Sequence, residues 1–207
     1  MYKKNFFIVF EGIEGSGKSS HSLSLIKKLK SLRISCVYLR EPGGSKGAEN
    51  IRDFLLKNEN KKFNSLTDTL LYLAARNENF LNKIKPFYKK KVIICDRFID
   101  STLAYQHYGF GIKKRFINFI NKEIMGTIKP DYTFLMYLDV NKSILRTSNR
   151  KTTNRYDKFK KSFYKKVQNG FLKISNSNKS KYMIIDSSKK FETNQTIIFN
   201  QVKKLIK

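Results

Sequence analysis

The sequence has few cysteines and no long apolar run. Its two cysteines, Cys36 and Cys95, lie at the ends of strand-like apolar runs, which favours buried side chains in a reducing cytoplasm over a disulfide or a metal pair. No apolar run approaches the roughly 18 residues of a membrane span. We also find no repeat, low-complexity tract or linker. Because 40% of the 207 residues are hydrophobic, we expect one folded domain over residues 1–207 rather than a disordered chain.

Acidic residues are scarce as well. The chain has 16 Asp and Glu against 43 Lys and Arg, a formal net charge of +27. Such an excess can indicate a nucleic-acid binder. The lysines are scattered along the chain, however. The sequence is also rich in Lys, Asn, Ile and Phe, whose codons are rich in A and T. Both observations favour compositional drift as the cause of the charge. We therefore expect no specific nucleic-acid partner, and we expect the charge to help gather anionic nucleotides.

Apolar runs alternate with helical patterns along the chain. The expected strands are 6–10, 34–39, 92–95, 133–138 and 182–185, and the expected helical regions are 18–31, 46–57, 66–85, 98–125 and 192–206. Alternation of this kind predicts parallel strands joined by right-handed crossovers, with helices on both faces of the sheet. We thus expect a three-layer α/β fold around a five-stranded parallel sheet, with ligands at the carboxyl ends of the strands.

A glycine-rich segment follows the first expected strand. Residues 12–19 read GIEGSGKS and match the phosphate-loop pattern G-x-x-x-x-G-K-[ST]. Glycines let backbone N–H groups turn towards a phosphate, Lys18 reaches the β- and γ-phosphates, and the Ser19 hydroxyl binds Mg²⁺. We expect ATP to be bound by Gly12, Ile13, Glu14, Gly15, Ser16, Gly17, Lys18, Ser19 and Ser20.

Other features narrow the class of phosphate-loop protein. The guanine-specific pattern N-K-x-D is absent, and the strand that ends at Asp96 continues with Arg97 instead of the Glu of a hydrolytic ATPase. Arginines suit phosphate recognition, and several stand at strand ends or in the polar stretch near residue 150. The candidates are Arg40, Arg76, Arg97, Arg146, Arg150 and Arg155. This pattern favours an enzyme that handles two polyanions.

At these residues the chain resembles the bacterial thymidylate kinases over nearly its whole length. The matching residues are 10–19, 40–45, 70–76, 96–98, 101, 104–106, 109, 111, 138–140, 146, 150, 154–157, 163, 170 and 171. The loop Glu41-Pro42-Gly43-Gly44 together with Asp96-Arg97-Phe98 and Ala104-Tyr105-Gln106 carries most of the specificity. The resemblance implies a P-loop kinase fold with a mobile lid at about 149–157, ATP and Mg²⁺ as cofactors, dTMP as acceptor and a homodimer. The apolar helix around 98–108 is a candidate for the dimer contact.

The resemblance also implies roles for single residues. Arg97 and Arg40 would hold the dTMP phosphate, Glu14 would contact the sugar 3′-hydroxyl or a metal-bound water, and Asp96 would orient Arg97 or help Ser19 to hold Mg²⁺. The catalytic set is Lys18, Arg97, Asp96, Glu14, Arg150 and Arg155. The dTMP-binding set is Glu14, Arg40, Tyr72, Arg76, Arg97, Ser101, Tyr105 and Gln106. Within it, Arg76 and Gln106 would read the thymine edge, Tyr72 would cover its face, and Tyr105 would exclude a ribose 2′-hydroxyl.

The lid departs from the family pattern. It reads Asn154-Arg155-Tyr156-Asp157 where the family has Asp-Arg-hydrophobic-Glu, which leaves open whether Arg150 or Arg155 is catalytic. We expect Arg150→Ala to lower kcat far more than dTMP affinity. Two alternatives remain: a kinase for another nucleoside or nucleoside monophosphate, and a nucleic-acid-binding phosphate-loop protein.

Overall fold

The computed structural model describes residues 6–57, 63–149, 156 and 159–206. Its centre is one parallel sheet in the order β2-β3-β1-β4-β5. The strands are β1 (Phe7–Glu11), β2 (Cys36–Arg40), β3 (Val92–Asp96), β4 (Tyr132–Tyr137) and β5 (Tyr182–Asp186). The expected five-stranded parallel sheet is therefore confirmed.

Helices follow each strand, and the expected regions 18–31, 46–57 and 192–206 are helical. The α-helices are α1 (Lys18–Ser31), α2 (Lys46–Lys57), α3 (Ser65–Asn79), α4 (Lys85–Phe87), α5 (Ile99–Thr102), α6 (Lys114–Met125), α7 (Val140–Ser148), α8 (Lys161–Asn176) and α9 (Phe191–Ile206). Two π-helical segments, η1 (Phe80–Ile84) and η2 (Leu103–Gly109), and a 3₁₀ turn, η4 (Lys179–Lys181), complete the described elements. None of the described helices combines the length and apolar character needed to cross a bilayer.

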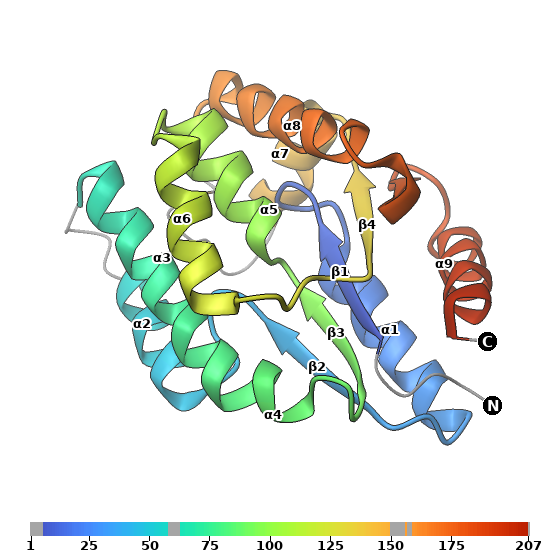
Figure 1. The fold of residues 1–207 in the computed structure, drawn as a ribbon. Coiled ribbons are helices and arrows are strands. Elements are labelled where there is room, and N and C mark those ends of the chain that lie inside the picture. Colours follow the sequence, from blue (N-terminus) through green and yellow to red (C-terminus); the bar gives the residue numbers. More distant parts are fainter. Residues whose placement is uncertain (1–5, 58–62, 150–155, 157–158, 207) are drawn as a thin grey trace.

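The strands of the sheet centre are apolar on both faces because helices cover both. Ile8 and Phe10 of β1 belong to a core that α1 and α9 close. Phe7 and Val9 point the other way, into a core shared with η1, α5 and α6. A third core forms where η2, α7 and α8 meet the carboxyl end of the sheet. Figure 1 shows the resulting three layers, with the strands between the two sets of helices.

The expected helical region 98–125 is divided into three pieces. A short α5 runs into the π-helical η2, and α6 begins only after Gly111, whose φ is 81°. Extra-residue π turns occur often at functional sites, and η2 contains Tyr105 and Gln106. The candidate dimer helix around 98–108 is largely enclosed within its own chain: Phe98, Leu103, Ala104 and Tyr105 are all buried, and η2 packs against α8.

Candidate active site

The carboxyl ends of β1, β2 and β3 border a cavity of about 460 Å³. Neighbouring parallel strands end at the same edge, so residues far apart in the sequence meet there. The lining includes all eight residues expected to bind dTMP and part of the phosphate loop. These are Glu14, Gly15, Gly17, Lys18, Ser19, Ser20, Arg40, Tyr72, Arg76, Asp96, Arg97, Ser101, Tyr105 and Gln106.

The phosphate loop links β1 to α1 and needs its glycines. Gly12 has a φ of 139°, and a Cβ added there would lie 2.4 Å from the carbonyl oxygen of Met136. Gly17 caps α1 in the left-handed region with φ 86° and makes no side-chain cap bond. The first N–H groups of α1 are therefore available to an anion. Ile13, expected to bind ATP, is fully buried in the apolar core, so its contribution would come from its backbone.

Lys18 is buried at the base of the loop. Its Nζ donates to the carbonyl oxygen of Ile13 at 2.7 Å and lies 3.4 Å from the Ser16 hydroxyl oxygen. Burial, followed by the positive charge of Arg97, lowers the pKa of Lys18 to about 7, although nearby carboxylates act in the opposite direction. A polyphosphate in the loop would stabilise the charged ammonium and raise this pKa.

Ser19 and Asp96 meet beside the loop. The Ser19 hydroxyl donates to Oδ2 of Asp96, and the Tyr38 hydroxyl lies 3.4 Å from the same oxygen. The other oxygen of Asp96, Oδ1, is buried and has no hydrogen-bond partner among the described residues. A hydroxyl oxygen and an unsatisfied carboxylate oxygen are hard ligands of the kind that Mg²⁺ prefers. The two residues thus fit the expected metal, directly or through water.

Arg97 directly follows β3 and lines the cavity beside the phosphate loop. Its Nη2 is 2.8 Å from Oε1 of Glu14, and its Nη1 donates to the Gly12 carbonyl at 2.9 Å and to the Ser101 hydroxyl at 3.1 Å. The other oxygen of Glu14 accepts from the Tyr105 hydroxyl. Burial alone would raise the pKa of Glu14, but Arg97 and Lys18 hold it below its usual value. The site thus keeps an ionised acid and a cation in contact.

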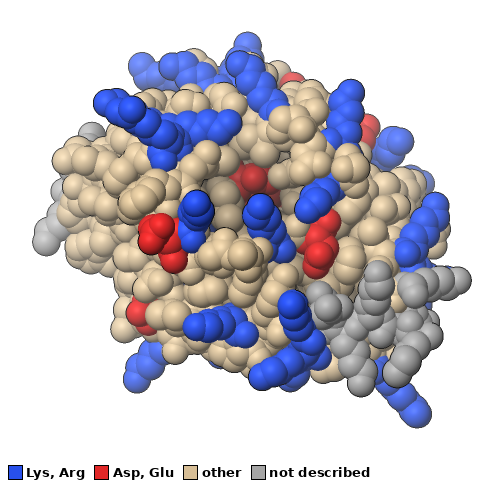
Figure 2. All heavy atoms as spheres, viewed as in Figure 1, with Lys and Arg blue, Asp and Glu red and all other residues tan. Residues whose placement is uncertain are grey.

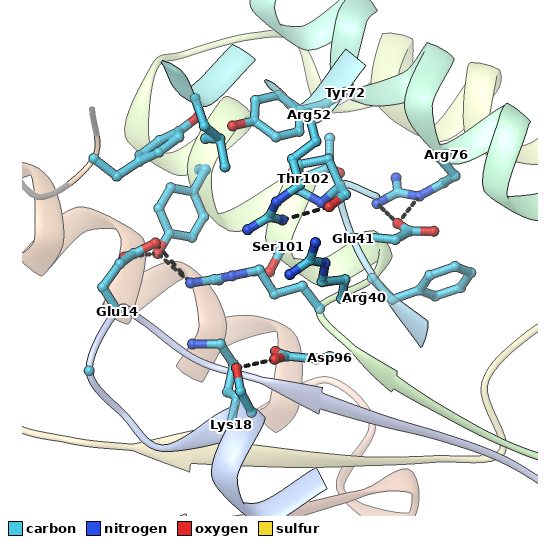
Figure 3. Close-up of a pocket in the computed structure, with 18 of the residues that line it drawn as sticks. Glu14, Lys18, Arg40, Glu41, Arg52, Tyr72, Arg76, Asp96, Ser101 and Thr102 are labelled. Carbon is cyan, nitrogen blue, oxygen red and sulfur yellow. Dashed lines mark hydrogen bonds and ion pairs between the residues drawn. The ribbon is translucent and has the colours of Figure 1, made fainter. Parts of the chain in front are cut away.

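Arg76 on α3 is buried with Glu41, the residue that follows β2. Nε and Nη2 of Arg76 each lie 2.8 Å from Oε2 of Glu41, and Nη1 donates to Oδ1 of Asn121 on α6 at 2.8 Å. Figure 3 shows this pairing at the edge of the cavity. A guanidinium has five N–H donors, so N–H groups on Nη1 and Nη2 remain for a ligand.

Two further arginines project into the cavity from β2 and α2. Arg40 forms an exposed pair with Glu49, with Nη2 and Oε2 2.8 Å apart. Arg52 donates from Nη1 to the Pro42 carbonyl at 2.6 Å and lines the cavity with Arg40 (Figure 3). Sequence reasoning missed Arg52, Glu41 and Asn121 as site residues. Glu41 stands in the Glu41-Pro42-Gly43-Gly44 loop, but its pairing with Arg76 depends on α3. No local pattern marks Arg52 or Asn121, which reach the site through the packing of α2 and α6.

A second hollow of about 380 Å³ adjoins the phosphate loop on its other side. Arg146 of α7 lies there and donates to the carbonyl oxygens of Gly15 and Ser187 at 3.2 and 3.1 Å. Phe191, stacked on His21 with ring centroids 4.5 Å apart, forms part of its lining. Of the expected lid, Arg150, Arg155 and most of 149–157 lie outside the described residues; Tyr156 is described, is buried and lines the main cavity.

The two hollows share the phosphate loop. A phosphate chain can lie along the loop, while a second anion can lie against Arg97, which lines the main cavity together with Lys18. An arrangement that holds two anions end to end is suited to passing a phosphoryl group between them. The fold and the site therefore place the chain among the P-loop phosphotransferases.

Comparison with known proteins narrows this class. The family model described as thymidylate kinase matches residues 10–198. The thymidylate kinase of Sulfurihydrogenibium sp. is 37% identical over 199 residues, covering 96% of this chain and 97% of that protein. That of Onion yellows phytoplasma is 40% identical over 203 residues, with 96% and 97% covered. The crystal structure of thymidylate kinase from Ehrlichia chaffeensis superposes with a TM-score of 0.78 at 32% identity, over 97% of this chain and 99% of that one. The chain belongs to the thymidylate kinase family.

Proposed function

We propose that the chain transfers the γ-phosphate of ATP to dTMP, giving dTDP and ADP. The observation that carries the proposal is the largely enclosed Arg97–Glu14 ion pair, which lines the same cavity as Lys18. The names of the relatives support the same reaction. The alternative of a kinase for another nucleotide has no specific observation in its favour.

The chemistry requires charge control more than proton transfer. A phosphate monoester has its second pKa near 6, so the acceptor oxygen is mostly ionised at pH 7. Two unit charges 4 Å apart interact by about 4 kcal/mol at an effective dielectric of 20, so repulsion between the anions is a main obstacle. Lys18 on the donor side and Arg97 on the acceptor side would offset it, and a lid arginine would complete the set.

The remaining residues would orient dTMP. The phosphate would bind Arg97 and Arg40. Glu14, still paired with Arg97, would contact the sugar 3′-hydroxyl or a metal-bound water. Tyr105 would pack where a ribose 2′-hydroxyl would clash. The lining also contains Tyr72, Arg76 and Gln106, which would cover the face of thymine and read its polar edge.

Mg²⁺ would be held by Ser19 and Asp96, and when bound it would neutralise charge on the β- and γ-phosphates. These residues fit the role because Oδ1 of Asp96 is buried and has no hydrogen-bond partner among the described residues.

We also propose that the protein is a homodimer, through a surface other than helix 98–108. The faces of α3 and α6 away from the core carry exposed Leu66, Leu70 and Phe119, of which Phe119 is 60% exposed. The two helices lie side by side, since Arg76 of α3 binds Asn121 of α6. Sedimentation of the wild type and of Leu70→Glu would test this, with a monomeric wild type refuting it.

The cytoplasmic location stays a prediction.

A nucleic-acid-binding function is not favoured. Figure 2 shows Lys and Arg side chains dispersed over the visible face, without one continuous stripe. Steep salt dependence of DNA binding at physiological ionic strength would support the alternative.

The deciding experiment measures ADP release from ATP and Mg²⁺ with dTMP, dUMP, dGMP and thymidine in parallel. We expect dTMP to be the fastest acceptor. The kcat/KM for dUMP should be lower by roughly 10- to 200-fold, because one methyl group contributes about 1–3 kcal/mol. Faster turnover of dGMP or thymidine would overturn the proposal.

A further inference from the structure

Glu11 lies under the acceptor side of the cavity. It is the last residue of β1, directly before the phosphate loop, and it is 1% exposed. A buried carboxylate is unfavourable unless its oxygens accept hydrogen bonds. Its partners therefore indicate its role.

Among the described residues, the side-chain hydrogen bonds of Glu11 come from the turn after β3 and from α5. Oε1 accepts from the backbone N–H groups of Phe98 at 2.7 Å and Ser101 at 3.1 Å. Oε2 accepts from the Ser101 hydroxyl at 2.5 Å. Helix α5 has four residues and cannot satisfy its own first N–H groups. The carboxylate of Glu11 does so from a neighbouring strand and fastens the turn to β1.

Arg97 opens this turn in a conformation that side chains disfavour. Its φ is 69°, in the left-handed region, so the surrounding contacts must hold it there. The Ser101 hydroxyl accepts from Nη1 of Arg97 while its hydrogen is directed to Glu11. Glu11 thus reaches Arg97 in two ways, through the backbone of the turn and through Ser101.

We propose that Glu11 is a positioning residue that sets Arg97 for the acceptor phosphate. This inference rests on the proposed function, in which Arg97 binds dTMP. The competing explanation follows from the chain itself: Glu11 precedes Gly12 and could instead support the phosphate loop. The two explanations differ in which substrate suffers, because Arg97 faces the acceptor and the loop faces ATP.

The test compares E11Q, S101A and the double variant with D131N as a matched control. Asp131 accepts from the backbone N–H of Phe7 at 2.8 Å, at the opposite end of β1. Burial and then Asp100 raise the pKa of Glu11 to about 7, although Ser101 and Arg97 partly offset this. Assays at pH 8 favour the ionised carboxylate. KM for dTMP and for ATP and the midpoint of thermal unfolding are measured for each protein.

We expect E11Q to raise the KM for dTMP about tenfold, since a hydrogen bond to a charged group is altered, with the KM for ATP within about twofold and D131N like the wild type. In the S101A background, E11Q should raise the KM for dTMP by a smaller factor than it does in the wild type, because both substitutions act on Arg97. Should E11Q fail to fold, S101A carries the same selective test. Equal changes in both KM values, unchanged dTMP KM, or additive effects would overturn the inference. A wild type inactive on dTMP would instead refute the proposed function.

Discussion

Arg76 and Arg40 border the same cavity, and each pairs with a carboxylate at 2.8 Å, yet their surroundings are opposite. The side chains of Arg76 and Glu41 are 3% and 5% exposed, whereas those of Arg40 and Glu49 are 48% and 36% exposed. Equal distances therefore describe two different interactions. In the buried pair each charge depends on its partner, while water can replace either partner in the exposed pair.

The difference in burial indicates which arginines of the cavity are held rigidly and which can move. The wall that holds Arg76 and Arg97 is built before a ligand arrives, because Glu41 and Glu14 fix both guanidiniums. Arg40 and its exposed partner can rearrange at little cost. Under the proposed function, Arg76 and Arg97 would offer dTMP a rigid surface and Arg40 an adjustable one.

Breaking the buried Arg76–Glu41 pair should have the largest effect, and this effect should be on stability. Arg76→Ala leaves Glu41 charged and unpaired, and we expect the free energy of unfolding to fall by about 3–5 kcal/mol. For a domain of this size the midpoint of thermal unfolding should drop by about 6–20 °C. The double variant with Glu41→Met should recover part of the loss in calorimetry. A single variant as stable as the wild type would show that burial does not distinguish the pairs.

The second-largest effect is expected for Arg97→Ala, and it should be on the affinity for dTMP. Hydrogen bonds to charged groups contribute about 1.5–3 kcal/mol each, so dTMP affinity should fall by about 100-fold or more. Titration calorimetry with dTMP checks this, and ATP binding serves as the control. Wild-type dTMP affinity would remove Arg97 from the acceptor site.

Arg40→Ala should have the smallest effect on stability. Exposed pairs contribute less than about 1 kcal/mol, so urea unfolding should barely change. The dTMP affinity should fall by several-fold at low salt, and the difference from wild type should shrink at high ionic strength because exposed charges are screened. A stability loss as large as that of Arg76→Ala would contradict the comparison.

Much of the site could be read from local patterns. The spacing of glycines before Lys18 predicted the phosphate loop, and Arg97 after the strand-end Asp96 was a candidate for phosphate recognition; both line the cavity at the sheet edge. Arg52 and Asn121 could not be found this way, because their place in the site depends on how α2 and α6 pack. The pairing of Glu41 with Arg76 joins residues 35 positions apart and was missed for the same reason. The boundary of η2 within the helical region 98–125 also escaped, since a π turn depends on packing against α8.

The sequence by itself determined the parallel sheet, the phosphate loop and the presence of several arginines, because strand hydrophobicity and glycine conformations act over a few residues. Only the tertiary structure decided which arginine is rigid. Arg76 and Arg40 are chemically alike in the sequence, and the difference between them arises from the water that α3 and α6 exclude around one and not the other. Burial is a property of the assembled fold, and it determines how strongly each arginine interacts with its carboxylate partner.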